Sequence, residues 1–321
     1  TPNPNYYGYE APGQPFLASV EFRYYDQAEQ ALQALQTGEV TGMANVPPNL
    51  LPTVLNTPNL NVFTARQPSY DIIFFNQTRE ELNFFQDKKV RQALMAGLNR
   101  QYIINTLFNG QALLATGPIL PGSWAYSNNL QPIIYDPERA ADLLTEAGWR
   151  YPAEALPGTA SYVRQKDERV LAFTLTMPDT PQHRAIGAII LENWNALGIQ
   201  VELTLVPPAD IQSDYLVTRE FEALYTTFTY LGMPDPDPYP LWHQTQAESG
   251  QNYSGFANTG ISELIEQARV NNSIADRRGL YIAFQARFTD ETPAILLWYP
   301  VYNYVVSDRV RGVRVGQFTD P

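Results

Sequence analysis

A proline-rich segment carries two carboxylates with a histidine close behind. In YLGMPDPDPYPLWHQ (230–244), prolines occupy every second position from 234 to 240, and Asp235 and Asp237 stand between them. Because proline fixes its own φ and moves the preceding residue out of the α region, we expect a stiff, extended, non-helical loop. Two carboxylates can serve as an acid–base pair, or can ligate a cation together with His243. A turn with solvated or capping carboxylates is the simpler interpretation, more so for Asp237 than for Asp235.

Composition and charge exclude several classes of protein. The chain has 321 residues and 44% hydrophobic content, which is enough for two domains and a sizeable core. A net charge of −12 argues against binding to nucleic acid. The absence of cysteine excludes disulfides and thiolate metal sites, and two histidines are too few for a His-rich metal centre. We therefore predict no metal site, no catalytic residue and no cofactor. No apolar stretch reaches the length of about 18 residues that a membrane span needs.

Hydrophobic periodicity predicts an α/β protein. Strands are expected at 16–25, 60–76 (broken near Pro68), 171–177, 199–205, 221–230 and 294–306. Helices are expected from Asp26 to Gly38, over 87–108 (one helix or a pair), after Asp136, from Thr180 to Gly198, and near 209–219, 260–270 and 276–290. The clearest part is 170–206, which is typical of a β-α-β unit with parallel strands.

Two loops of this pattern follow strands directly. They are MPDTPQH (177–183) and LGMPDPDP (231–238). Because open α/β sheets bind ligands at the carboxyl ends of their strands, we expect a ligand site at these loops. Tyr230, Gly232 and Met233 lie closest to the strand end and are predicted to line the cleft. A sharp backbone turn is an alternative reason for the glycine.

Three segments resemble the family 5 extracellular solute-binding proteins, the peptide, nickel and oligosaccharide receptors of ABC importers. VRQALMAGLNRQYIINTLFNG (90–110) is similar to the signature helix of that family. GPILPGSWAYSNNLQPIIYDPERAADLLTEAGW (117–149) continues the match in order and spacing, and GMPDPDP (232–238) resembles the segment after the substrate-lobe strand. The beginning of the chain, NPNYYG through FRYYDQAEQALQALQTGEV, also fits. The resemblance therefore covers nearly the whole chain.

The resemblance implies a fold and a location. It implies a two-lobe periplasmic-binding-protein-like α/β fold (type II, cluster C-like), with mixed sheets and flanking helices. Residues 1–76 would form part of lobe I, 77–290 the substrate-binding lobe II, and 291–321 the C-terminal return to lobe I. Family members carry a further N-terminal portion, so the resemblance implies a chain truncated at its N-terminus. A signal or lipoprotein peptide would lie in that portion, which implies an extracytoplasmic, lipid-anchored protein.

The resemblance also implies a function without catalysis. The protein would act as a monomer that captures an oligopeptide or similar small solute between its lobes and delivers it to the membrane subunits of an ABC permease. Two other classes stay open. A regulator can reuse this fold as its ligand-sensing domain, and a hydrolase would use Asp235 and Asp237. No nucleophile–base–orienter set is visible in the sequence, which disfavours the hydrolase.

Site residues follow from the resemblance as well. In the peptide-binding branch, an aspartate three residues before the first Asp of the DPD segment pairs with the peptide α-amine, and here Gly232 holds that position. Losing that charge-assisted bond removes about 1.5–3 kcal/mol, which is compatible with an oligosaccharide, a modified peptide or another amine-free solute, unless Asp235 takes over the charge. Further solute contacts are expected at Asp179, Thr180, Tyr70, Phe74, Asn76 and Trp124. The structural alternatives are a helix cap for Thr180, sheet core for the residues at 70–76, and a packed loop for the tryptophan.

Overall fold

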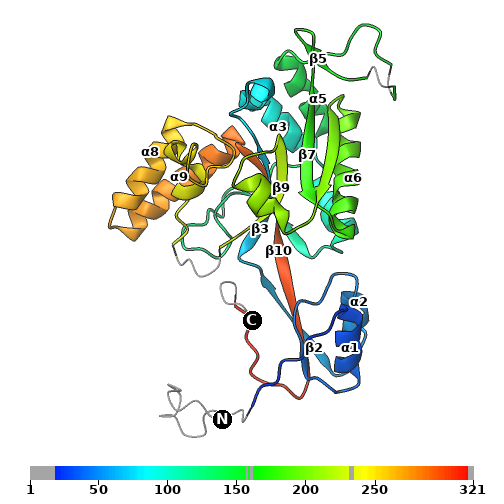
Figure 1. The fold of residues 1–321 in the computed structure, drawn as a ribbon. Coiled ribbons are helices and arrows are strands. Elements are labelled where there is room, and N and C mark those ends of the chain that lie inside the picture. Colours follow the sequence, from blue (N-terminus) through cyan, green and yellow to red (C-terminus); the bar gives the residue numbers. More distant parts are fainter. Residues whose placement is uncertain (1–18, 157, 160–161, 231–234, 317–321) are drawn as a thin grey trace. The chain divides into compact units, whose positions relative to one another are not determined.

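A computed structural model describes residues 19–156, 158–159, 162–230 and 235–316 (Figure 1). The chain forms two compact units, one of residues up to Phe63 with Asn303–Arg314, the other around Thr64–Tyr302. The lobe boundaries expected from the sequence, at 76 and 290, remain a prediction. Among the described residues, every helix is too short or too polar to cross a bilayer.

The first unit packs short elements against the end of a long strand. Its elements are α1 (Ala28–Gln36), β1 (Gly42–Met43), α2 (Leu51–Leu55), β2 (Leu60–Arg66) and the last part of β10 (Ala294–Ser307). β1 lies antiparallel to β10, with Gly42 opposite Val306. Leu32 and Leu35 of α1 pack with Val54 and Val305, which gives this unit a small core of its own.

Two sequence predictions for this unit are wrong. The described part of the strand expected at 16–25 is not a strand, because its backbone finds no neighbouring strand among the described residues. The first helix begins at Ala28, and the cap position is held by extended Gln27 without a side-chain bond, not by Asp26. An apolar, aromatic run favours a strand only where a partner strand is present, and that information is not local.

The second unit is built on a mixed sheet with the strand order β10-β3-β9-β7-β8. The strands not yet given are β3 (Ser69–Phe75), β4 (Ala112–Leu114), β7 (Ala172–Pro178), β8 (Gln200–Val206) and β9 (Ala223–Thr229). β7 is parallel to both β8 and β9, whereas β3 is antiparallel to β9 and β10. The parallel β-α-β unit predicted over 170–206 is confirmed, with α6 (Pro181–Ala196) as its helix.

Helices cover both faces of this sheet (Figure 1). They are α3 (Lys88–Ala96), α4 (Arg100–Leu107), α5 (Pro137–Glu146) and α6 on one side, and α8 (Thr259–Val270) and α9 (Ile274–Glu291) on the other. Because side chains of a strand alternate between faces, Ile73 and Phe75 belong to the first core, and Ile72 and Phe74 to the second. Every residue of β3 is therefore buried.

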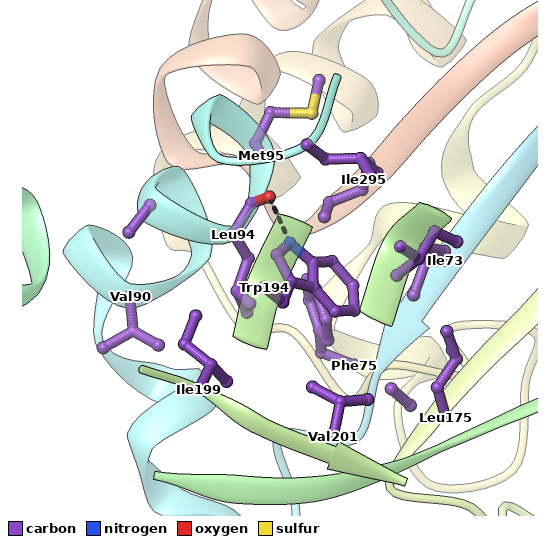
Figure 2. Packing of buried hydrophobic residues seen from close by; sticks show 14 of the residues in the cluster. Ile73, Phe75, Val90, Leu94, Met95, Leu175, Trp194, Ile199, Val201 and Ile295 are labelled. Carbon is purple, nitrogen blue, oxygen red and sulfur yellow. Dashed lines mark hydrogen bonds between the residues drawn. The ribbon is translucent and has the colours of Figure 1, made fainter. Parts of the chain in front are cut away.

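Trp194 of α6 shows how the first core is fixed. Its ring is fully buried, and its Nε1 donates to the carbonyl of Leu94 in α3 at 2.9 Å, as Figure 2 shows. Ile199 and Val201 lie below the ring, and Phe75 lies beside it (Figure 2). The hydrogen bond satisfies the indole nitrogen, so the large ring adds apolar contact without leaving a buried donor unpaired.

Most helix boundaries follow local signals. The helix expected over 87–108 is a pair, α3 and α4, and the predicted caps Asp136 and Thr180 both accept a backbone N–H. One prediction is wrong, because Tyr239–Trp242 forms a helical turn, α7, inside the segment expected to be extended. Its prolines sit at the cap and in the first turn, where no intrahelical N–H is needed. Minor elements are η2 (Glu80–Gln86), β5 (Gln165–Lys166), β6 (Arg169–Val170), η3 (Ile211–Leu216) and η4 (Gln244–Gln246).

Candidate ligand-binding site

The carboxyl ends of β7 and β9 form one edge of the sheet. Thr176 of β7 lies opposite Leu224 of β9, and the two strands run in the same direction. β3 begins at this edge, since Ser69 is paired with Thr229, and the Tyr230 N–H donates to the Pro68 carbonyl at 2.7 Å. The loops predicted to hold a ligand therefore leave the sheet on the same side. We call this side the β7/β9 edge.

Asp179 and Thr180 form the link from β7 to α6. Thr180 Oγ1 accepts the backbone N–H of His183 at 3.2 Å and lies 2.7 Å from the His183 Nδ1. Arg184 binds Asp179 with two nitrogens, at 2.6 and 2.8 Å. Thr180 is thus a helix cap, as the structural interpretation required. Asp179 stays partly exposed at the β7/β9 edge.

Tyr70 and Tyr230, both predicted contacts, come together at this edge. Their ring centroids are 5.9 Å apart, and Tyr70 also stacks on Phe228 at 5.6 Å. The Tyr230 hydroxyl donates to the carbonyl of Pro118 at 3.1 Å. Burial raises the pKa of both tyrosines, so their hydroxyls stay neutral and can donate hydrogen bonds. Both side chains are buried, at 0% and 6% exposure, so the pair belongs to the core that lies behind the edge.

Phe74 and Asn76 are placed elsewhere. Because β3 is antiparallel to β9, Phe74 lies opposite Leu224 near the beginning of β9, away from the β7/β9 edge. Asn76 Nδ2 donates to the carbonyls of Arg219 and Phe221 at 3.1 and 3.0 Å. The structure does not bring these two residues together with Tyr230, and a role for them in ligand contact stays a prediction.

The proline-rich loop is attached to the helical layer through ion pairs. Arg277 of α9 donates to Asp235 Oδ2 at 2.6 Å, and its guanidinium lies over the ring of Trp124 at 5.1 Å. Arg269 of α8 lies 3.1 Å from Asp237 Oδ2. Trp124 is therefore half-buried against α9, which supports the packed-loop interpretation. Gly232 and Met233 lie outside the described residues.

The carboxylates of this loop and His243 have separate partners. His243 Nε2 bonds Glu266 at 2.9 Å, whereas Asp235 and Asp237 each face an arginine. Within the part of the chain that the structure describes, no three acidic or histidine side chains are grouped as a metal site requires. The hypothesis of a cation held by these three residues has no support in this geometry.

Asp71 is the residue that sequence reasoning missed. It lies in the middle of β3, only 7% exposed, among aromatic and aliphatic neighbours. Its Oδ2 accepts the Tyr225 hydroxyl at 2.7 Å and the Trp298 Nε1–H at 2.6 Å, and its Oδ1 accepts the Thr227 hydroxyl at 2.7 Å. A carboxylate inside the otherwise apolar stretch SYDIIFF was the signal, because a buried charge needs specific partners.

The pKa of the Asp71 carboxyl is set by its burial and by its neighbours. Burial raises the pKa of its carboxyl, and the three donated hydrogen bonds oppose that shift. His183, at the start of α6, packs its ring edge-on against Tyr225 at 5.1 Å between centroids. Burial lowers the pKa of His183, and the Asp71 charge opposes this. The two groups therefore interact across the β7/β9 edge without forming an ion pair.

This fold is that of a known class of binding protein. Residues 1–251 match the family model of the bacterial extracellular solute-binding proteins, family 5 Middle. The chain belongs to this family, which confirms the resemblance seen in the sequence.

Named relatives agree with that assignment. The oligopeptide-binding protein AppA of Bacillus subtilis is 27% identical over 309 residues, covering 94% of this chain and 54% of the relative. The dipeptide-binding protein of Escherichia coli is 24% identical over 303 residues, covering 93% and 53%. The chain thus spans about half the length of the curated relatives it matches.

Solved structures show the same fold. The Bacillus subtilis AppA complex with a nonapeptide superimposes with a TM-score of 0.76 at 25% identity, covering 91% of this chain and 56% of the other. NikA from Brucella suis, solved with Fe(III)-EDTA, gives 0.75 at 20% identity, covering 91% and 58%. The predicted α/β fold of the solute-binding proteins is therefore confirmed.

Proposed function

We propose that this chain serves in an extracytoplasmic receptor that captures an oligopeptide and delivers it to the membrane subunits of an ABC permease. The observation that carries the proposal is the family match over residues 1–251. The receptor acts as a monomer and makes or breaks no covalent bond. Lipid attachment is the form of anchoring that we expect.

The β7/β9 edge supports the proposal physically. At this edge Asp179 is partly exposed and paired with Arg184, Thr227 is an exposed residue, and the aromatic rings of Tyr70 and Tyr230 are buried. Polar side chains at the mouth of an apolar core are typical of small-molecule sites. Capture would follow from closure of the lobes around the solute. Closure is favoured to the extent that the solute contacts the closed state better than the open one.

The names of the relatives support peptide as the solute class, because those described above are named for oligopeptides and dipeptides. An oligosaccharide or another amine-free solute is the competing class, because Gly232 carries no carboxylate for an amine.

The test begins with the full-length protein purified from its native source. The protein is denatured, and the small molecules that it releases are identified by mass spectrometry. Peptides are the expected result. An oligosaccharide would overturn the peptide class and keep the receptor, whereas an empty extract together with no binding of a synthetic peptide pool would overturn the receptor.

A variant pair connects the result to the β7/β9 edge. Asp179→Ala should weaken binding of the peptide pool about tenfold, as expected for one lost charge-assisted hydrogen bond. Asp142→Ala, an exposed position on α5, is the matched control and should bind as the wild type does. Equal affinities of the two variants would show that Asp179 does not contribute to peptide binding.

A further inference from the structure

Two polar atoms in the core behind the β7/β9 edge are unsatisfied. They are the hydroxyl oxygen of Tyr70 on β3 and the indole nitrogen of Trp242 on α7. Both side chains are almost completely buried, at 0% and 1% exposure. Within the part of the chain that the structure describes, neither atom has a hydrogen-bond partner. Because buried polar groups are nearly always bonded to protein or to ordered water, these two atoms require a partner.

The two atoms are neighbours, and the hydroxyl of Tyr230 lies close to them. Burial is the main reason why the pKa of Tyr70 is raised, and the Tyr230 hydroxyl adds to the shift whereas the Trp242 indole opposes it. The ring centroids of Tyr70 and Tyr230 are 5.9 Å apart. Three polar groups therefore lie near one another without a direct hydrogen bond from Tyr70 or Trp242. A water molecule commonly bridges polar groups in this arrangement.

The three groups have complementary hydrogen-bonding capacities. The indole nitrogen of Trp242 can only donate, whereas the hydroxyl of Tyr70 can donate and accept. The Tyr230 hydroxyl already donates its proton to the Pro118 carbonyl at 3.1 Å, so its oxygen is left as an acceptor. A buried water typically makes about three hydrogen bonds to polar groups that would otherwise be unsatisfied. One water can therefore satisfy Tyr70 and Trp242 together.

We propose that one water molecule binds between Tyr70, Tyr230 and Trp242 as a structural part of this core. The water accepts the Trp242 Nε1–H and the Tyr70 hydroxyl proton, and it donates to the Tyr230 oxygen. Tyr230 directly follows β9, and Trp242 belongs to α7, which begins at Tyr239. The water thus connects the residues on both sides of the loop 231–238 to β3. This binding site is independent of the proposed function.

The direct test is a crystal structure of the full-length protein at a resolution that shows ordered water. We expect electron density for one water within hydrogen-bond distance of Trp242 Nε1 and of the hydroxyls of Tyr70 and Tyr230. Trp194 is the matched control, because its buried Nε1 donates to the Leu94 carbonyl and should contact no water. A direct hydrogen bond between Tyr70 and Trp242, or a site without density, would overturn the inference.

A substitution gives a second test, because the sign of its effect depends on the water. Tyr70→Phe keeps the ring and removes the hydroxyl. With the water bound, the variant loses a hydrogen bond, and the unfolding equilibrium constant of the full-length protein in urea should rise about tenfold. Without the water, removal of an unsatisfied hydroxyl should leave that constant unchanged or lower it, which would contradict the inference. Tyr102→Phe, at an exposed tyrosine, is the control and should unfold as the wild type does.

Discussion

The carboxylates at two places in the second unit have opposite kinds of partner, charged at one place and neutral at the other. Asp235 and Asp237 lie on a partly exposed loop, and each is paired with an arginine of the helical layer. Asp71 lies inside the sheet and is held by three neutral donors. The carboxylates that are most conspicuous in the sequence are therefore the ones whose charge is already matched.

The comparison shows how burial changes the strength of the electrostatic interactions that a carboxylate makes. An exposed ion pair is screened by water and contributes little, so Asp235 and Asp237 chiefly attach a loop. A buried carboxylate interacts through a less polar medium, which strengthens its attraction to any cation that reaches it. In this molecule, aspartates of the loop are matched by arginines, whereas the aspartate inside the sheet is held by neutral donors.

The largest expected effect is the loss of protein stability when Asp71 is substituted. Asp71→Ala leaves the Trp298 and Tyr225 donors buried without an acceptor, and we expect the free energy of unfolding to fall by about 3 kcal/mol. Asp235→Ala should cost about 0.5 kcal/mol, because Asp235 is 46% exposed at its side chain. Urea denaturation of the 321-residue chain measures both. Similar losses for the two variants would erase the contrast between the sites.

An intermediate effect is expected within the loop. In a double-mutant cycle, Asp235→Asn with Arg277→Gln should give a coupling energy of about 1 kcal/mol, and less in high salt. The Arg277 side chain is 19% exposed, whereas Arg269, the partner of Asp237, is 46% exposed. The Asp237–Arg269 cycle is thus the matched control and should give a smaller coupling. A larger coupling energy for Asp237–Arg269 than for Asp235–Arg277 would show that burial of the arginine does not determine the strength of the ion pair.

The smallest expected effect is a pH dependence from His183. Burial lowers its pKa in the folded state below the ordinary 6.5, so between these two values the unfolded chain binds more protons. The contribution of His183 to the free energy of unfolding is therefore fully present above pH 6.5. It is lost as the pH falls from there through the lowered pKa of the folded state. His183→Gln should therefore lose less thermal stability than the wild type between pH 7.5 and 5.5, the interval in which we propose to record melting curves.

Two comparisons are needed to assign the pH dependence of the melting curves to His183. The Asp71 carboxyl contributes with the opposite sign, because a carboxyl with a raised pKa takes up its proton sooner in the folded state. The variant is therefore compared with the wild type at each pH and not judged alone. Between pH 8.5 and 7.5, where His183 titrates in neither state, the two proteins should change in parallel. A difference there would assign the effect to something other than this histidine.

Local signals predicted the elements that rest on local physics. Thr180 caps α6 and Asp136 caps α5 because each side chain accepts an N–H a few residues ahead. The parallel pair around α6 followed from alternating apolar residues. The strand expected at 16–25 and the extended form expected at Tyr239–Trp242 were wrong, since the first depends on a distant partner and the second on proline positions within a helical turn.

The candidate site was predicted only in part. Tyr70 and Tyr230 were predicted as separate contacts, and they meet because β3 begins where β9 ends, which the sequence did not show. Phe74 and Asn76 were grouped with them along the sequence, but an antiparallel strand carries them to the other end of the sheet. Nothing in the immediate neighbourhood of Asp71 in the sequence says which donors it meets.

The sequence by itself determined the family, the α/β class and the order of most elements, since these depend on periodicity, caps and segment similarity. Only the tertiary structure decided which carboxylate is matched by a cation. Asp235 meets Arg277 across 42 residues, and Asp71 meets Trp298 across 227. The free energy of a charge depends on burial and on partners within a few ångströms, and both arise from the folding of distant segments onto one another.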